Sequence, residues 1–359
     1  MSKKLRELDF PLLFIVLVLT FTGILLIYSS SPGKELWKKQ LIWGIFSIIL
    51  LFLVLFLNIK SIIFYSPIFY ILSIIPLFYL IFFGKKIAGS KSWIDFGYFL
   101  IQPSEFVKIT TALFLSKIIS NFKKDSLTFQ NLFIISIITF IPIFLIFLQP
   151  DYGTALIFAF FLFASIFLGG IRISTVILLT VILLISGFFL WEYILKDYHK
   201  SRIIAIFFPE FDPEGGSYQP LQSKIAIGSG GLLGKGFLKG TQTKAGFLPA
   251  SSTDFILASA GEEFGFLGIF LILSLYLLLF MRIFKIIEDI EDKGVLVFVF
   301  LTFSLIFFQF FLNVSMVLGF FPVIGIPLPF LSYGGSSLLS LYLGIGLILN
   351  GKIRGKIEK

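Results

Sequence analysis

Apolar runs long enough to cross a lipid bilayer follow one another along most of this 359-residue chain. A helix needs roughly 20 apolar residues to cross the hydrocarbon core, and helices satisfy their own backbone there. Hydropathy predicts ten spans, and an even number places both termini on one side. These spans are Pro11–Tyr28, Lys39–Leu57, Ile62–Phe83, Pro103–Ser120, Asn131–Leu148, Thr154–Gly169, Ser174–Tyr193, Phe255–Ile283, Gly294–Phe320 and Ser336–Asn350.

The composition favours the same fold class. Hydrophobic residues make up 57% of the chain and charged residues 14%, with a mean hydropathy of +1.02, whereas soluble domains carry roughly a quarter charged residues. We predict an all-α polytopic membrane protein, with residues 1–359 as a single integral membrane domain. The first run is too long for the apolar part of a signal peptide and no small-residue cleavage site follows it, so we expect it to be a retained span.

The rare residue types exclude several kinds of site. The chain has no Cys, so it has no disulfide framework and no thiolate metal site. Its single histidine, His199, excludes a site that needs two histidines. In a chain this apolar, the net charge of +9 indicates membrane topology and anionic lipid rather than nucleic acid.

The distribution of Lys and Arg predicts the orientation. The termini and alternate loops carry fifteen of these cations, and the short loops opposite carry six. The positive-inside rule therefore places both termini in the cytoplasm. It places a long loop, residues 194–254 between the seventh and eighth spans, outside. That loop holds seven further cations, which suit an anionic ligand or, equally, lipid headgroups.

The polar stretch Tyr218–Gly265 contains most of the candidate chemistry. Its glycines, in GSGGLLGKG, offer N–H groups for phosphate beside Lys235 and Lys239, although flexible glycine turns have the same composition. Asp254 ends the polar part, directly before an apolar run. It is either the N-cap of the eighth span or a carboxylate base at the membrane boundary.

Three further polar clusters lie at outer ends of spans. In the first, Gly89–Lys108, Pro103 suits a first helical turn, and Glu105 and Lys108 share a face as a catalytic or a purely structural pair. In the second, QPDYGT, Asp151 is a cap or a site residue. The third, Pro322–Ser337, is rich in Pro and Gly, which at membrane depth indicates backbone that lines a cavity.

Motifs in these clusters resemble the SEDS family of shape, elongation, division and sporulation proteins (RodA, FtsW and SpoVE). They cover nearly the whole chain in the family's order: WIDFG, QPSE, QPDYGTA, YQPLQSKIAIGSGG, GKGFLKGTQT, TDFI, GEEFGFLG and NVSMVLGFFPVIGIPLPFLSYGGSS. GKG followed by GTQ, and MVLG followed by PVIGIPLPF, resemble RodA more than its division relative FtsW.

The resemblance implies a ten-helix glycosyltransferase that polymerises lipid II into peptidoglycan on the outer face of the cytoplasmic membrane during cell elongation. It also implies a class B penicillin-binding protein as partner. The family's catalytic carboxylate falls on Asp254, and its polar cavity residues fall on Gln102, Ser104, Glu105 and Lys108. With the other polar positions of the clusters, the candidate substrate-binding residues are Lys91, Trp93, Gln102, Ser104, Glu105, Lys108, Asp151, Gln222, Lys235, Lys239, Thr241, Gln242, Ser332 and Tyr333.

Two departures from the family pattern concern charge. A paired Arg-Arg is usual before the Trp, but Lys91 and Ser92 stand here, and Ala250, Ser251 and Ser252 replace the usual Glu and His before Thr-Asp. Asp254 would accept the proton of the attacking sugar hydroxyl. The polyprenyl pyrophosphate leaving group would need cations or a divalent metal such as Mg²⁺.

Two other functions suit the same residues. A lipid II flippase would use the same cavity, although transporters usually show repeated halves with paired broken helices and no such repeat is visible. A non-catalytic scaffold of a wall-synthesis complex would not need Asp254. An in vitro polymerisation assay separates the three.

Overall fold

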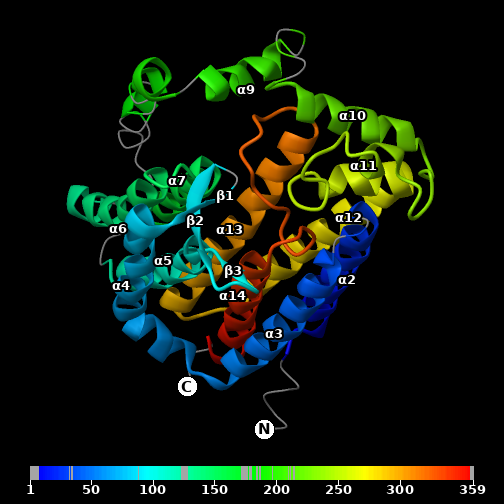
Figure 1. The fold of residues 1–359 in the computed structure, drawn as a ribbon. Coiled ribbons are helices and arrows are strands. Elements are labelled where there is room, and N and C mark those ends of the chain that lie inside the picture. Colours follow the sequence, from blue (N-terminus) through cyan, green and yellow to red (C-terminus); the bar gives the residue numbers. More distant parts are fainter. Residues whose placement is uncertain are drawn as a thin grey trace.

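The computed structural model consists mainly of helices (Figure 1). It describes residues 8–31, 33, 35–87, 89–122, 128–170, 177, 180–182, 185, 187–195, 197–208, 210, 212 and 215–355. The α-helices are α2 (Phe10–Ser30), α3 (Leu36–Phe56), α4 (Ile59–Phe83), α5 (Pro103–Ser120), α6 (Phe129–Phe147), α7 (Tyr152–Leu168), α9 (Asp197–Phe207), α10 (Tyr218–Gly230), α11 (Thr241–Lys244), α12 (Ile256–Glu288), α13 (Lys293–Val317) and α14 (Gly335–Arg354), with a π-helical turn at Leu190–Ile194. The strands are β1 (Lys85–Ile87), β2 (Ser90–Asp95) and β3 (Leu100–Ile101).

The helical membrane architecture predicted from hydropathy is confirmed. Within the described residues, seven helices are long and apolar enough to cross a membrane: α2, α3, α4, α6, α12, α13 and α14. Helix α5 occupies the fourth predicted span, but it contains Glu105, Lys108 and Lys117, and α7 occupies the sixth with 17 residues. The seventh predicted span, Ser174–Tyr193, lies partly outside the described residues.

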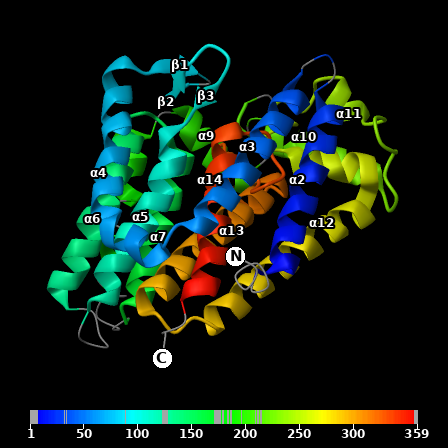
Figure 2. The same cartoon turned by 90° about the horizontal axis from the view of Figure 1, so that it is seen from below.

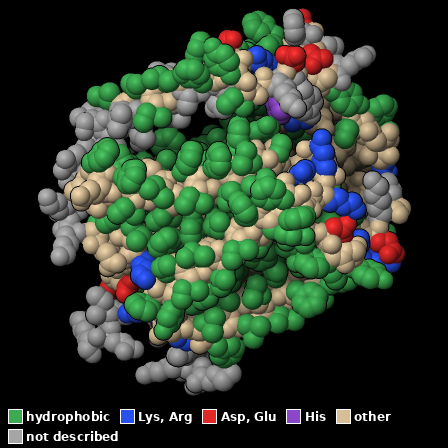
Figure 3. Space-filling view, turned by 60° about the vertical axis from the view of Figure 1, so that its left-hand side comes forward, with side chains coloured by type: hydrophobic (Ala, Val, Ile, Leu, Met, Phe, Trp, Pro, Cys, Tyr) green, Lys and Arg blue, Asp and Glu red, His purple; other side chains and the backbone are tan. Residues whose placement is uncertain are grey.

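The outer surface of the bundle is apolar. Large hydrophobic side chains on α2, α3 and α4 face outward, among them Phe14, Phe46 and Phe64, which are 66%, 54% and 62% exposed. Figure 3 shows hydrophobic side chains covering the middle of one face, with charged side chains toward its margins. Such a continuous apolar surface is unfavourable in water, and lipid contact accounts for it.

Helices α13 and α14 form the centre of the bundle. In an apolar stretch of 18 residues in each helix, 67% of α13 and 72% of α14 is buried inside the protein. The corresponding shares are 28% for α3 and 22% for α4. Polar side chains of α14 reach its neighbours: Tyr342 bonds Thr20 of α2 at 2.9 Å, and Asn350 donates to the carbonyls of Val54 and Leu57 at 2.7 and 2.8 Å. These bonds fix the axial position of α14 between α2 and α3.

One buried carboxylate joins three helix ends. Asp9, the N-cap of α2, pairs with Arg282 of α12 and Lys352 of α14, each at 2.6 Å. The beginning of α2 and the ends of α12 and α14 therefore lie together. Figures 1 and 2 place the C-terminus at the end of the bundle opposite α10, α11 and the strands.

A small antiparallel sheet precedes α5. Its order is β1-β2-β3, with Lys85 opposite Trp93 and Ile94 opposite Ile101. The sequence patterns did not predict these strands. They are too short for a clear alternating pattern, and they hold the chain that enters α5.

The predicted eighth span is not one continuous helix. Gly265 interrupts α12 with φ 64° and ψ −160°, a conformation that only glycine adopts readily. Residues on both sides of the break bond the preceding loop: Phe266 N–H donates to Gly231 O at 2.9 Å, and Lys235 N–H donates to Glu262 O at 3.0 Å. A short, almost fully buried helical piece, Ile256–Phe264, therefore precedes the membrane-spanning part of α12.

Candidate functional site

Asp254 lies just before the short helical piece of α12. The N-cap of α12 is Phe255, and no side chain caps it. The interpretation of Asp254 as the cap of this helix is therefore wrong, because the helix begins one residue later than a capping role for Asp254 requires. Its carboxylate is free for another role.

The loop that carries Asp254 is held by the Pro- and Gly-rich segment after α13. Ser332 donates its hydroxyl to Thr253 O at 2.6 Å, and Tyr333 N–H donates to Ser252 O at 2.9 Å. Asn313 of α13 donates to the carbonyls of Asp254 and Ile326 at 2.8 and 2.7 Å. The backbone at Asp254 is thus fixed from two directions, which preorganises the carboxylate.

The surroundings of Asp254 suit a general base. Burial raises the pKa of Asp254 to about 6, while the Arg202 guanidinium and the Thr253 hydroxyl pull the pKa down. The side chain remains partly exposed. A carboxylate whose pKa lies close to the working pH combines ionisation with useful basicity.

Glu105 and Lys108 form a buried ion pair in the first turns of α5. The N-cap of α5 is Gln102 and Pro103 follows it, as the sequence predicts. Lys108 Nζ lies 2.8 Å from Glu105 Oε1, and the two side chains are 1% and 3% exposed. Ser340 of α14 donates to the other oxygen of Glu105 at 3.2 Å.

Asp151 adjoins this pair and also caps α7. One carboxylate oxygen accepts Thr154 N–H at 3.2 Å, so Asp151 caps α7, one of its two predicted roles. The other oxygen accepts the Gln102 amide at 2.8 Å. Burial raises the pKa of Asp151, and the nearby Glu105 charge raises it further. The hydroxyl of Ser104 is buried and has no hydrogen-bond partner among the described residues. The polar cluster of Gln102, Ser104, Glu105, Lys108 and Asp151 is therefore mostly buried, and the Ser104 hydroxyl in it lacks a hydrogen-bond partner among the described residues.

The two carboxylate clusters lie against the same irregular segment. A Cβ added to Gly153, next to the Asp151 cap, would lie 2.4 Å from Ile324 O, and one added to Gly325 would lie 3.8 Å from Asp254 Oδ2. The segment after α13 therefore lies against both Asp254 and the turn at Asp151.

Several predicted loop residues instead surround Glu262. This fully buried carboxylate accepts Lys235 Nζ at 2.8 Å, the Thr241 hydroxyl at 3.1 Å and the Gln242 N–H at 2.8 Å. The predicted glycine cradle is also engaged, because Gly234 N–H donates to Gly230 O and Gly236 N–H donates to Glu263 O. These contacts fold the loop onto the break in α12 and leave no open phosphate cradle among those N–H groups.

The remaining predicted residues lie around these clusters. Lys91 N–H donates to Gln149 O at 3.1 Å, which places β2 beside the Asp151 turn. Trp93 in β2 and Gln222 in α10 are partly exposed, and Lys239 is exposed. Ser92, at the position of the missing second cation, is 2% exposed and bonds Ser90 at 2.8 Å.

Two residues that act on Asp254 or on its loop were not among the predicted site residues. Arg202 of α9 donates to Val323 O at 2.5 Å and acts electrostatically on Asp254. Asn313 interrupts an otherwise apolar run in α13, and a polar residue within a span is a signal that could have singled it out. Arg202 carried no such signal, because it is one of seven cations in a long loop.

The described residues contain no group of three or more acidic or histidine side chains arranged to hold a metal ion. Carboxylate oxygens are the ligands that Mg²⁺ prefers, and those of Glu105 and Glu262 are committed to lysines. In the described part of the chain, the carboxylates of Glu105 and Glu262 are therefore not available to a divalent cation.

Comparison with known proteins gives concordant results. A family model described as cell cycle protein, covering FtsW, RodA and SpoVE, matches residues 10–355. The peptidoglycan glycosyltransferase MrdB of Escherichia coli K12 is 36% identical over 348 residues, which cover 96% of this chain and 93% of that protein.

Two solved structures have a similar fold. One was described under the heading of structural coordination of polymerization and crosslinking by a peptidoglycan synthase complex. It matches with a TM-score of 0.84 and 26% identity, covering 96% of this chain and 97% of that one. The crystal structure of Thermus thermophilus rod shape determining protein RodA matches with a TM-score of 0.72 and 25% identity over 98% of both chains.

Proposed function

The chain belongs to the cell cycle protein family of FtsW, RodA and SpoVE, and we propose on that basis that Asp254 is the general base of its glycosyl transfer. The protein is a peptidoglycan glycosyltransferase that polymerises lipid II during cell elongation. The observation that carries the proposed role is a single carboxylate, held by Asn313 and Ser332 beside irregular backbone, whose pKa burial raises to about 6.

The proposed step is an inverting substitution. The hydroxyl oxygen of the acceptor sugar attacks the anomeric carbon of the donor and forms the new glycosidic bond. The bond from that carbon to the diphosphate oxygen breaks, and the electron pair leaves with the polyprenyl diphosphate. Asp254 takes the hydroxyl proton. Attack from the face opposite the leaving group inverts the anomeric centre, as in inverting glycosidases.

The Glu105–Lys108 pair serves this site by orienting substrate beside Asp151 and Gln102. Its ions are neutralised by each other, so the lysine can hold a phosphate or sugar oxygen at little further desolvation cost. The unpartnered Ser104 hydroxyl offers an additional hydrogen bond. Lys91 and Trp93 lie in the strand next to this cluster and would contact the same substrate.

We propose a class B penicillin-binding protein as the partner that crosslinks the new strands. The support is the similarity to a chain from a peptidoglycan synthase complex that coordinates polymerization and crosslinking. The exposed apolar surface of α2, α3 and α4 is available for a transmembrane helix as well as for lipid.

Purified protein, with and without such a partner, should convert labelled lipid II into glycan strands. Strands resolved by gel electrophoresis support the glycosyltransferase. If reconstituted protein moves lipid II between leaflets but makes no strands, it is a flippase. A protein that does neither, but is required in the partner's complex, is a scaffold.

Both termini are expected in the cytoplasm and α10 outside. Since the chain is Cys-free, single cysteines report topology cleanly. Ser229→Cys, at an exposed position of α10, should react with a membrane-impermeant thiol reagent in intact cells. Lys359→Cys should react only after permeabilisation. Labelling of position 359 but not 229 in intact cells would reverse the topology.

A further inference from the structure

A buried amide lies in the second turn of α3, a helix that otherwise faces outward. Gln40 is 1% exposed, whereas its neighbours Leu41 and Ile42 are each 41% exposed. Gln40 was not among the predicted site residues. Burying an amide is unfavourable unless it is hydrogen-bonded, and a polar side chain inside a membrane helix usually has a specific role. The partners of Gln40 indicate what that role is.

Both ends of the Gln40 amide bond the backbone just before α14. The side-chain nitrogen donates to Ser332 O at 3.1 Å, and the side-chain oxygen accepts Gly334 N–H at 3.1 Å. One planar amide thus fixes two peptide groups that are two residues apart. One turn further along α3, the Trp43 indole occupies the space that a Cβ on Gly335 would need. The backbone that enters α14 therefore lies directly on α3.

The same stretch of backbone holds the loop that carries Asp254. The Ser332 hydroxyl donates to Thr253 O at 2.6 Å, and Tyr333 N–H donates to Ser252 O at 2.9 Å. The two bonds made by the α3 amide lie on either side of Tyr333 in the chain. The amide is therefore one residue removed from both contacts that hold the loop.

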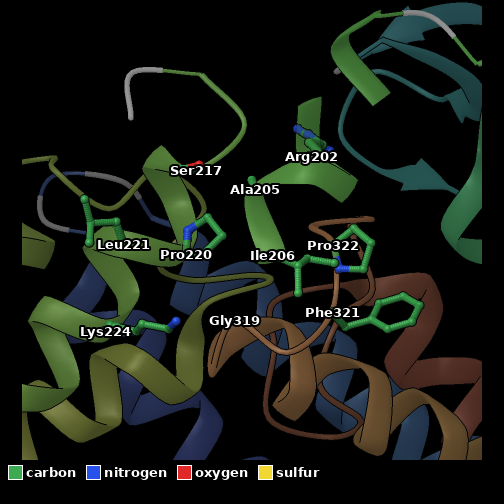
Figure 4. Close-up of a pocket in the computed structure, with 10 residues that line it drawn as sticks. All are labelled: Arg202, Ala205, Ile206, Ser217, Pro220, Leu221, Lys224, Gly319, Phe321 and Pro322. Carbon is green, nitrogen blue, oxygen red and sulfur yellow. The ribbon is translucent and has the colours of Figure 1, made fainter. Parts of the chain in front are cut away.

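The earlier part of the segment after α13 lies against other elements. Gly319, Phe321 and Pro322 line a small pocket together with residues of α9 and α10 (Figure 4). The later part, Leu328–Gly334, contains the backbone groups that Gln40 bonds. Helix α3 therefore acts on the part of the segment that holds the Asp254 loop.

We propose that Gln40 is a positioning residue for glycosyl transfer, which places the Asp254 carboxylate by holding the backbone of Ser332–Gly334. The inference rests on the proposed function for the role of Asp254. A general base must lie within hydrogen-bond reach of the proton that it takes, and a misplacement of about 1 Å can slow a reaction about a hundredfold. Gln40 acts through this backbone and not on the substrate.

Asn350 provides a matched control for a purely structural role. It is also a fully buried amide with two bonds to backbone, and it joins α14 to the other end of α3, at Val54 O and Leu57 O. Asn350→Leu removes these bonds and leaves the segment before α14 untouched. If Gln40 only held α3 against α14, the Gln40 and Asn350 variants would have the same effects.

The first measurement is the rate of glycan strand formation at varied lipid II concentration by Gln40→Met and Asn350→Leu protein. Met keeps the length of the Gln side chain but offers no amide. Both variants should melt at a lower temperature than wild type. Gln40→Met should lower kcat about tenfold or more and leave the KM for lipid II close to wild type, whereas Asn350→Leu should change neither. Equal losses of kcat in the two variants, or a raised KM with wild-type kcat in Gln40→Met, would overturn the proposal.

A thiol in the Asp254 loop reports its position without turnover. Ser252 is 9% exposed and the chain has no Cys, so Ser252→Cys should react slowly with a thiol reagent. Adding Gln40→Met should speed this reaction about tenfold, because a loop that has lost its support opens more often. Adding Asn350→Leu should leave the reaction rate unchanged. Equal rates in all three proteins would contradict the proposed role of Gln40.

Ser332→Ala tests the next link and decides the question if Gln40→Met does not fold. It removes the bond to Thr253 O but leaves both Gln40 bonds, which go to backbone groups. Ser332→Ala should also speed the reaction of Ser252→Cys, and an unchanged rate would overturn the proposal. The double variant Gln40→Met/Ser332→Ala should lose less kcat than the product of the two single losses, because both act on one loop. Losses that multiply would mean that the two residues act independently.

Asp254→Asn separates this inference from the proposed function. If Asp254→Asn polymerises like wild type while Gln40→Met exposes Ser252→Cys, Asp254 is not the base and the hold of Gln40 on the loop stands. If Asp254→Asn is slow while Gln40→Met neither exposes the thiol nor lowers kcat, the base stands and the positioning role fails alone.

Discussion

Asp254→Asn protein is expected to fold and insert normally but to polymerise lipid II about 10²–10⁴-fold more slowly than wild type. Asn keeps the size and hydrogen-bonding shape of the side chain but accepts no proton. The bond that Asn313 makes at this position goes to the backbone carbonyl, so the substitution leaves it in place. No helix cap is lost, since α12 begins at Ile256 with Phe255 as its N-cap.

The measurement is the initial rate of glycan strand formation by purified variant and wild type with the partner present. Thermal unfolding in the same detergent controls for folding. Near-wild-type polymerisation by Asp254→Asn would remove the carboxylate from the mechanism. The search would then move to Glu105 and to Asp151, whose turn lies against the same segment after α13.

The pH dependence follows from the same carboxylate. With a pKa raised by burial to about 6, Asp254 is ionised only above that pH, so the wild-type rate should rise through about pH 6 and then level. Because this folded-state pKa exceeds the ordinary 3.8, the folded state binds the proton more tightly. Ionisation of Asp254 therefore lowers the free energy of unfolding as the pH rises from about 4 to about 6. Asp254→Asn should accordingly melt no lower than wild type above pH 6.

Lys108→Met should lower both folding stability and activity. It leaves Glu105 buried at 3% exposure without its cation, and breaking a buried pair from one side costs about 3–5 kcal/mol. The single variant alone therefore cannot separate a structural role from a functional one. The variant that separates them is Glu105→Gln/Lys108→Met, which removes both charges together.

The double variant should recover most of the stability, because a neutral pair in the same volume is often tolerated. Gln still accepts the hydroxyl of Ser340. If Lys108 holds a substrate oxygen, polymerisation by the folded double variant should remain about tenfold to a hundredfold below wild type. A double variant that melts and polymerises like wild type would make the pair purely structural.

Lys117→Met is the control for this series. It makes the same side-chain change in the last turn of α5, where Lys117 donates to Phe64 O at 2.7 Å. It has no carboxylate partner within salt-bridge distance in the described part of the chain. Its stability and rate should stay close to wild type. A loss equal to that of Lys108→Met would mean that any lysine in α5 matters for insertion rather than for the site.

Local sequence was sufficient wherever a feature depends on neighbours in the chain. Apolar runs predicted most membrane helices, since length and hydropathy are properties of a segment by itself. Pro103 at the start of α5, the Asp151 cap of α7 and the pairing of Glu105 with Lys108 were predictable for the same reason. Each of these features involves groups that are at most three residues apart in the chain.

Contacts between distant segments were decided by the tertiary structure alone. Asp254 precedes an apolar helix as an N-cap would, and only the structure shows that this helix begins one residue later, with Phe255 as its N-cap. The sequence around Lys235 predicts a phosphate ligand, but in the structure its ammonium group pairs with the carboxylate of Glu262, 27 residues away. Arg202 lies 52 positions before Asp254 and acts on its charge. Burial and Coulomb energy depend on distance in space, and separation along the chain does not reveal that distance.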